Sequence, residues 1–129
     1  MTARITPGRT LTSLVWATAV GILLQAVSAG QFISGLTNAL GVHSIVGTVL
    51  EVIGLALVVA AGVDRRTRRH CRGRWLAALL LGVALLVQAG LGHAPGAVPT
   101  AVHVPLGVAL FAGATVLAIA LAPTNASAT

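Results

Sequence analysis

Charged side chains are scarce in this sequence, and aromatic side chains are scarcer still. Charged residues make up 8% of the 129-residue chain and aromatic residues 3%, whereas a soluble domain usually carries about a quarter charged residues. Hydrophobic residues make up 57% of the chain, and so few charges cannot give such a chain a surface that water solvates. The composition therefore predicts a membrane protein whose surroundings are the lipid bilayer.

Thiol groups are equally rare, since Cys71 is the single cysteine. One cysteine excludes an internal disulfide framework. Tyrosine is absent, and alanine, glycine, valine and leucine dominate, which suits helices that pack closely in lipid. The net charge of +6 comes from basic residues at the predicted helix ends, so anionic lipid is the expected partner of these residues and nucleic acid is not.

Four apolar runs follow one another along the chain, and each is long enough to cross a bilayer, which takes about 20 residues. The intervening segments are a glycine-containing loop over 31–41, an arginine-rich loop over 64–74 and a turn rich in proline and glycine over 93–100. We therefore predict a single membrane domain over residues 1–129, with an all-α fold: a transmembrane antiparallel four-helix bundle. The predicted spans are residues 11–30, 42–63, 75–92 and 101–122.

The positions of the arginines predict how the bundle lies in the membrane. Six arginines lie in the loop over 64–74, two precede the first span, and the other two loops and the C-terminal tail have none. The positive-inside rule then places both termini and the basic loop in the cytoplasm of a multi-pass protein of the cell (inner, or plasma) membrane. Trp16 and Trp75 fall near that inner face, where interfacial tryptophans are common.

Two matching strings begin the second and fourth spans: HSIVGTVLEVIG from His43 and HVPLGVALFAGA from His103. Each places a glycine four residues after its histidine, Gly47 and Gly107, and residues four apart share one face of a helix. The flanking sequences also match, since LLQAVSAGQF and LLVQAGLGHA pair two glutamines, Gln25 and Gln88. This internal hairpin repeat predicts a pseudo-twofold axis along the membrane normal, with both imidazoles at one depth and pointing inward.

Paired imidazoles of this kind are suited to haem iron, which takes two strong axial ligands in electron-transfer cytochromes. We therefore predict that His43 and His103 are the metal ligands of a haem b. Gly47 and Gly107 then belong to the cofactor-binding site, because a glycine one turn away leaves room for the flat macrocycle. The alternative for these glycines is helix packing alone, and the alternative for each histidine is a wetted polar residue at a helix end.

The same residues carry a resemblance to a known family. The histidines of the second and fourth spans, with LLQAVSAGQFISGL and VQAGLGH, resemble one half of haem A synthase, a membrane enzyme of two four-helix bundles. The chain also resembles small bacterial four-span membrane proteins with H-x-x-x-G on helices two and four. This likeness covers roughly residues 11 to 122 and implies that His43 and His103 are haem ligands. The chain has one bundle, and Leu40 stands where that family has an acidic residue.

Two further polar residues have open roles in the sequence. Glu51 is the only acid within a span, and intramembrane acids are functional candidates by default. It is either a proton site coupled to haem reduction or a structural acid bonded to a neighbour such as Gln88 or Thr18. His93 is either a solvated turn residue, a substrate-side base or a metal ligand, and a copper or zinc site would combine it with the other two histidines.

The predicted function is that of a haem-binding, cytochrome b-like membrane protein that transfers electrons or senses redox state near the outer face, with other membrane redox subunits as partners. The alternative is a cofactor-free accessory or scaffold subunit of a membrane complex. A transporter ranks third, because no pair of broken helices is evident. The sequence shows no nucleotide-binding loop, nucleophile triad or hydrolytic site. The favoured interpretation is therefore that the protein is not an enzyme on its own.

Overall fold

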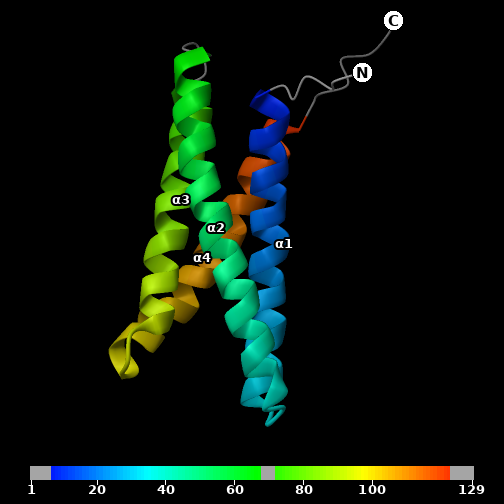
Figure 1. The fold of residues 1–129 in the computed structure, drawn as a ribbon, viewed down its shortest axis with the longest axis vertical. Coiled ribbons are helices and arrows are strands. Elements are labelled where there is room, and N and C mark those ends of the chain that lie inside the picture. The colour runs from blue at the N-terminus through cyan, green and yellow to red at the C-terminus, as the bar shows by residue number, and fades with distance from the viewer. Residues whose placement is uncertain (1–6, 68–71, 123–129) are drawn as a thin grey trace, which may run out of the picture.

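The computed structural model describes residues 7–67 and 72–122, and these residues form helices joined by short turns (Figure 1). All four helices are long and apolar enough to cross a membrane. They are predicted by runs of apolar residues in which Glu51 is the only charged residue. Large apolar side chains remain exposed on every one of the helices, as a lipid environment allows. The helices are α1 (Pro7–Ile33), α2 (Asn38–Thr67), α3 (Arg72–His93) and α4 (Ala97–Leu121).

The helices extend beyond the predicted spans, so the predicted loops are too long. Only residues 34–37 and 94–96 separate the helices at one end of the bundle, and Gly35 and Gly96 turn the chain there with φ values of 95° and 113°. Pro99 and Thr100, predicted to lie in a turn, belong to the first turn of α4. Proline is tolerated there because the first N–H groups of a helix have no intrahelical partner.

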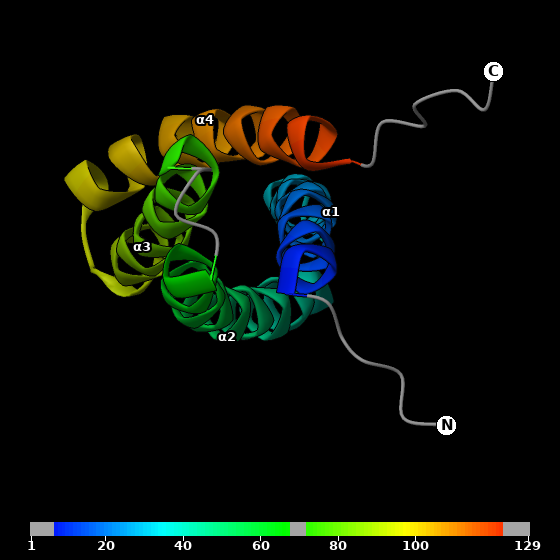
Figure 2. The same ribbon diagram turned by 90° about the horizontal axis from the view of Figure 1, so that it is seen from above.

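The four helices pack in a ring in which α1 and α3 each contact both α2 and α4 (Figure 2). The start of α1 lies beside the end of α4, where Thr12 Oγ1 donates to the main-chain oxygen of Leu121 at 3.4 Å. Helices α2 and α4 therefore occupy diagonal positions in the ring. A pseudo-twofold axis along the membrane normal, as the repeat predicts, is compatible with this diagonal arrangement of the helices that carry His43 and His103.

The helices α2 and α3 approach each other closely at a pair of glycines, Gly54 and Gly82. A Cβ atom added at Gly82 would lie 2.8 Å from the main-chain oxygen of Gly54, and one added at Gly54 would lie 3.2 Å from the oxygen of Gly82. Such backbone approaches, with Cα–H groups facing carbonyl oxygens, are typical of membrane helices that meet through small residues. This glycine contact therefore helps to join the hairpins α1–α2 and α3–α4, together with the packing of α1 against α4.

The core that all four helices share does not extend along the whole bundle. Towards the end that carries the turns 34–37 and 94–96, each helix contributes one last residue to this shared core. Closer to that end, only Ser28 and Ala39 are buried among the described residues. Figure 1 shows that the two hairpins part at this end. We call this end the histidine end, and the space between the parted hairpins the interhairpin opening. The last shared core residues are Ile22, Leu50, Leu85 and Leu110.

Candidate functional site

His43 lies in the second turn of α2 and is held against α1. Its Nδ1 atom is 3.2 Å from the main-chain oxygen of Gln25 and 3.2 Å from Ser28 Oγ. The Ser28 hydroxyl donates to the same Gln25 oxygen at 3.0 Å, and Ser28 is only 2% exposed. The imidazole of His43 is thus fixed by a main-chain carbonyl of its own hairpin, at the buried contact between α1 and α2.

His103 is held in the same way by the other hairpin. Its Nδ1 atom is 3.0 Å from the main-chain oxygen of Gln88, and Gln88 Nε2 donates to the main-chain oxygen of His103 at 2.8 Å. No hydroxyl takes part here, because Leu91 stands where the first hairpin has Ser28. Instead the ring lies against Gly92, where an added Cβ would come within 3.0 Å of His103 Cε1.

These contacts decide which nitrogen of each imidazole carries the proton. A main-chain carbonyl only accepts hydrogen bonds, so Nδ1 of His43 and Nδ1 of His103 must be the protonated atoms that donate to Gln25 and Gln88. In a neutral imidazole the other nitrogen, Nε2, then has a free lone pair. A metal-bound histidine commonly shows this arrangement, in which the nitrogen that does not bind metal donates to a carbonyl or carboxylate.

Gly47 and Gly107 make room for the glutamine side chains. A Cβ atom at Gly47 would lie 2.9 Å from Gln25 Nε2, and one at Gly107 would lie 3.1 Å from Gln88 Nε2. Each glutamine packs its amide across the hairpin onto the glycine one turn beyond the histidine. That these glycines also clear space for a macrocycle stays a prediction. The amide oxygens of Gln25 and Gln88 are buried and have no hydrogen-bond partner among the described residues.

Gln25, His43 and Gly47 form a Gln–His–Gly unit in one hairpin, and Gln88, His103 and Gly107 form the equivalent unit in the other. Sequence comparison matched Gln25 with Gln88 and His43 with His103 but did not connect the glutamines to the histidines. The structure shows that each glutamine binds its histidine through the main-chain oxygen. The signal that could have indicated this is that both glutamines keep nearly the same distance in sequence from their histidines, 18 residues in one hairpin and 15 in the other.

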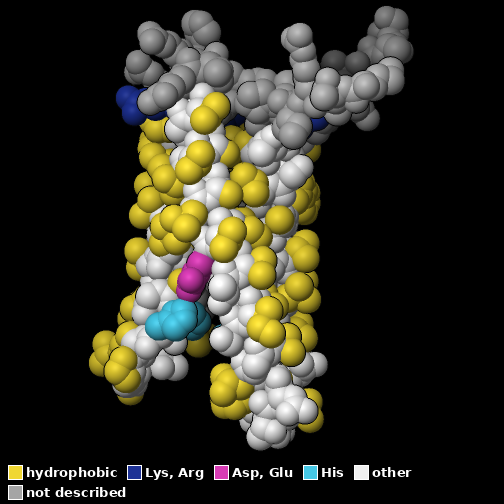
Figure 3. Space-filling view, in the orientation of Figure 1, with side chains coloured by type: hydrophobic (Ala, Val, Ile, Leu, Met, Phe, Trp, Pro, Cys, Tyr) yellow, Lys and Arg dark blue, Asp and Glu magenta, His cyan; other side chains and the backbone are white. Residues whose placement is uncertain are grey.

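Both histidines lie at the interhairpin opening. His43 and His103 are partly buried, and each lies two turns before the last shared core residue of its helix, Leu50 or Leu110. Positions seven apart share a helix face, so both histidines are on the faces of α2 and α4 that turn inward farther along the bundle. Figure 3 shows that the molecule is hollowed between the two hairpins on this side.

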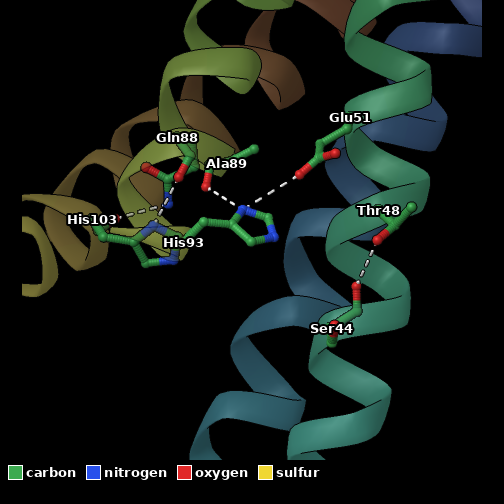
Figure 4. Close-up of polar contacts among 7 residues, drawn as sticks. All are labelled: Ser44, Thr48, Glu51, Gln88, Ala89, His93 and His103. Carbon is green, nitrogen blue, oxygen red and sulfur yellow. Dashed lines mark hydrogen bonds and ion pairs between the residues drawn. The ribbon is translucent and has the colours of Figure 1, made fainter. Parts of the chain in front are cut away.

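Glu51 and His93 meet at the head of the opening, where Figure 3 shows acidic and histidine side chains together. His93 Nδ1 is 3.6 Å from Glu51 Oε1 and 2.8 Å from the main-chain oxygen of Ala89 (Figure 4). The alternatives that named Gln88 or Thr18 as the partner of Glu51 are therefore wrong. Packing brings α3 across α2 at this level, and Thr18 Oγ1 instead donates to its own helix, at Leu14.

His93 is the last residue of α3 and not part of the turn, although its side chain is 72% exposed, as a solvated residue would be. The described residues hold no group of three or more histidine, cysteine or acidic side chains that could bind a metal ion. His43, His93 and His103 are thus not gathered into one copper or zinc site. His70 and Cys71 lie outside the described residues.

Comparisons with known proteins do not place the chain in a family. No family model, no curated protein and no solved structure matches it.

Proposed function

We propose that the protein binds one haem b between His43 and His103 and acts as a membrane cytochrome in one-electron transfer or redox sensing. The observation that carries the proposal is the contact of each Nδ1 with a main-chain oxygen, of Gln25 or Gln88. Since a carbonyl only accepts, Nδ1 holds the proton and each Nε2 keeps a lone pair. Bound haem would supply the one-electron chemistry of its iron. The chain supplies two ligands whose orientation is set before the cofactor binds.

The donor set and the surroundings of the histidines suit such a group. Two neutral imidazoles are a common axial pair for electron-transfer haem. His43 and His103 lie beyond the last shared core residues of their helices, Leu50 and Leu110, so no shared core lies between the hairpins at their level. The N-termini of α2 and α4 lie at this end of the bundle, and the dipole of a helix favours negative charge at its N-terminus. Nearby polar side chains at this end are Ser34, Thr37, Asn38 and Thr100.

The haem test uses the purified full-length chain in detergent or lipid nanodiscs. Titration with haemin is expected to give one haem per chain, with the Soret and α bands of a six-coordinate, bis-imidazole iron in the reduced state. The measurements are the absorption spectrum and the haem content by pyridine haemochrome. A chain that folds as a helical bundle and binds no haem at low micromolar concentration would contradict the proposal.

We propose further that the helices run antiparallel across the cell membrane, with both termini and the basic loop in the cytoplasm and the histidine end outside. The described arginines Arg9, Arg65 and Arg74 lie near the ends of their helices away from the turns 34–37 and 94–96. At that end the Arg65 guanidinium stacks over the Trp75 ring at 5.1 Å from its centroid. This pairing suits the membrane interface, where tryptophan and arginine are both favoured.

The native Cys71 makes the orientation directly testable. With a membrane-impermeant maleimide on intact cells, Ser34→Cys in a Cys71→Ser background is expected to be labelled, because residue 34 lies in an exposed turn at the histidine end. The unaltered chain, with Cys71 alone, is expected to be labelled only after the membrane is permeabilised. The opposite pattern would place the histidine end in the cytoplasm and overturn this orientation.

A cofactor-free accessory subunit is the second candidate, and one observation favours it. Several glycines within the helices are exposed and have nothing within 4 Å of an added Cβ. Small residues on open helix faces are what membrane helices use to pack against one another. A folded chain without haem that co-purifies with other membrane subunits would support this function. These glycines are Gly30, Gly41, Gly62, Gly90 and Gly113.

A further inference from the structure

Glu51 and His93 belong to different hairpins, and their contact crosses the head of the interhairpin opening. Glu51 lies in the middle of α2, and its side chain is 33% exposed. His93 ends α3, and its ring turns back along its own helix so that Nδ1 reaches the Ala89 oxygen at 2.8 Å and faces Glu51 Oε1 at 3.6 Å (Figure 4). An acid within a membrane span is costly unless a partner compensates its charge, and His93 is the partner that the fold supplies.

The orientation of the His93 ring gives its two nitrogen atoms different surroundings. Because the Ala89 oxygen accepts from Nδ1, that nitrogen carries a proton, and the Glu51 carboxylate lies on the same edge of the ring. Nε2 lies on the opposite edge of a side chain that is 72% exposed. A single metal ion therefore cannot bind both Nε2 of His93 and the Glu51 carboxylate, because the carboxylate lies beside Nδ1. A carboxylate behind Nδ1 is instead the arrangement that orients an imidazole and stabilises its imidazolium form during acid–base chemistry.

The surroundings leave the two groups to interact mainly with each other. Helix α2 packs against α1 and α3, and α3 packs against α2 and α4. Among the described residues of these helices, the arginines lie near the other end of the bundle, and the other titratable groups at the histidine end are His43 and His103. Ser44 and Thr48 continue from Glu51 along one side of α2 and are exposed, so this side of the opening is polar enough to hold water.

We propose that Glu51 and His93 form a proton-binding dyad at the head of the opening, in which Nε2 of His93 takes up one proton from water at the histidine end. The only bond formed in the protein is the N–H bond at Nε2, and the Glu51 carboxylate compensates the imidazolium charge. Resting on the proposed haem function, the proton taken up by the dyad would offset the charge of an electron added to the iron, because opposite charges attract each other. Reduction is then accompanied by proton uptake.

The first test needs no haem and uses the fact that the chain has a single glutamate. Full-length protein labelled with ¹³C at the glutamate carboxyl is titrated with acid in nanodiscs and followed by NMR. The Glu51 signal is expected to show two steps, its own protonation and the response to His93. His93→Gln should remove the second step, and the matched control His70→Gln should keep it. A second step that survives in His93→Gln, or a single step in the unaltered chain, would overturn the dyad.

The second test uses haem-loaded protein and measures proton uptake on reduction with a pH indicator in weakly buffered solution. Uptake of up to one proton per electron is expected in the unaltered chain and a loss of that uptake in both Glu51→Gln and His93→Gln, each normalised to its haem content. Unchanged uptake in both variants would overturn the link to the haem. If the chain binds no haem, the proposed function fails, and the NMR titration still decides the dyad.

Discussion

Alanine in place of His43 or His103 is expected to abolish the bis-imidazole spectrum and to weaken haem binding by about 100-fold or more. Loss of a group that only orients a metal-binding histidine typically costs 10- to 100-fold in metal affinity, and removal of the ligand itself should cost at least as much. Each variant keeps one Nε2 lone pair, in the hairpin that is not altered. The measurements are haemin titration and the absorption spectrum in the oxidised and reduced states.

The matched control for the ligand variants is His70→Ala, which alters a histidine of the predicted basic loop, outside the described residues. This variant is expected to bind haem as the unaltered chain does. Circular dichroism of every variant checks that the helical content is kept, so that loss of haem is not loss of fold. If His43→Ala and His103→Ala both kept a six-coordinate spectrum, neither histidine would be a ligand and the haem assignment would be wrong.

Alanine in place of Gly82 is expected to have the largest effect on stability among single changes in the helices. Its Cβ would lie 2.8 Å from the main-chain oxygen of Gly54, 3.1 Å from Leu57 Cβ and 3.1 Å from Val58 Cγ2. A main-chain oxygen cannot rotate out of the way as a side chain can, so α2 and α3 must move apart. Overpacking of this kind costs about 1–3 kcal/mol, to be measured as the free energy of unfolding in a detergent titration followed by circular dichroism.

Gly90→Ala is the matched control, because Gly90 lies on the same helix and an added Cβ meets nothing within 4 Å. There alanine is expected to leave stability unchanged or to raise it by up to about 1 kcal/mol, since glycine is the poorer helix former. Equal stability of the two variants would show that the contact between Gly54 and Gly82 does not join the hairpins. Separation of the hairpins in Gly82→Ala should also widen the opening and lower the affinity for haem.

The sequence by itself determined the membrane class, the number of long apolar helices and the repeat that pairs His43 with His103. Composition indicates that lipid surrounds the chain, and lipid requires each helix to satisfy its own backbone hydrogen bonds. Residue spacing along a helix then shows which side chains share a face. The lengths of the turns were harder to predict. Gly41 and Pro99 indicate breaks on local grounds, yet both lie in the first turn of a helix. Proline is tolerated there because the N–H that it lacks would have had no intrahelical partner, and a single glycine costs a helix only about 1 kcal/mol.

Only the tertiary structure decided what the polar residues touch. That Gln25 and Gln88 hold the histidines through main-chain oxygens, and that Glu51 meets His93, depends on how one helix is rotated and shifted against the next. A sequence pattern shows which residues share a face of one helix, but it does not show which atoms of a neighbouring helix lie opposite. For Glu51 and His93, a close glycine contact between the same two helices, α2 and α3, contributes to that relation, because backbones can approach so closely only where no side chain stands between them.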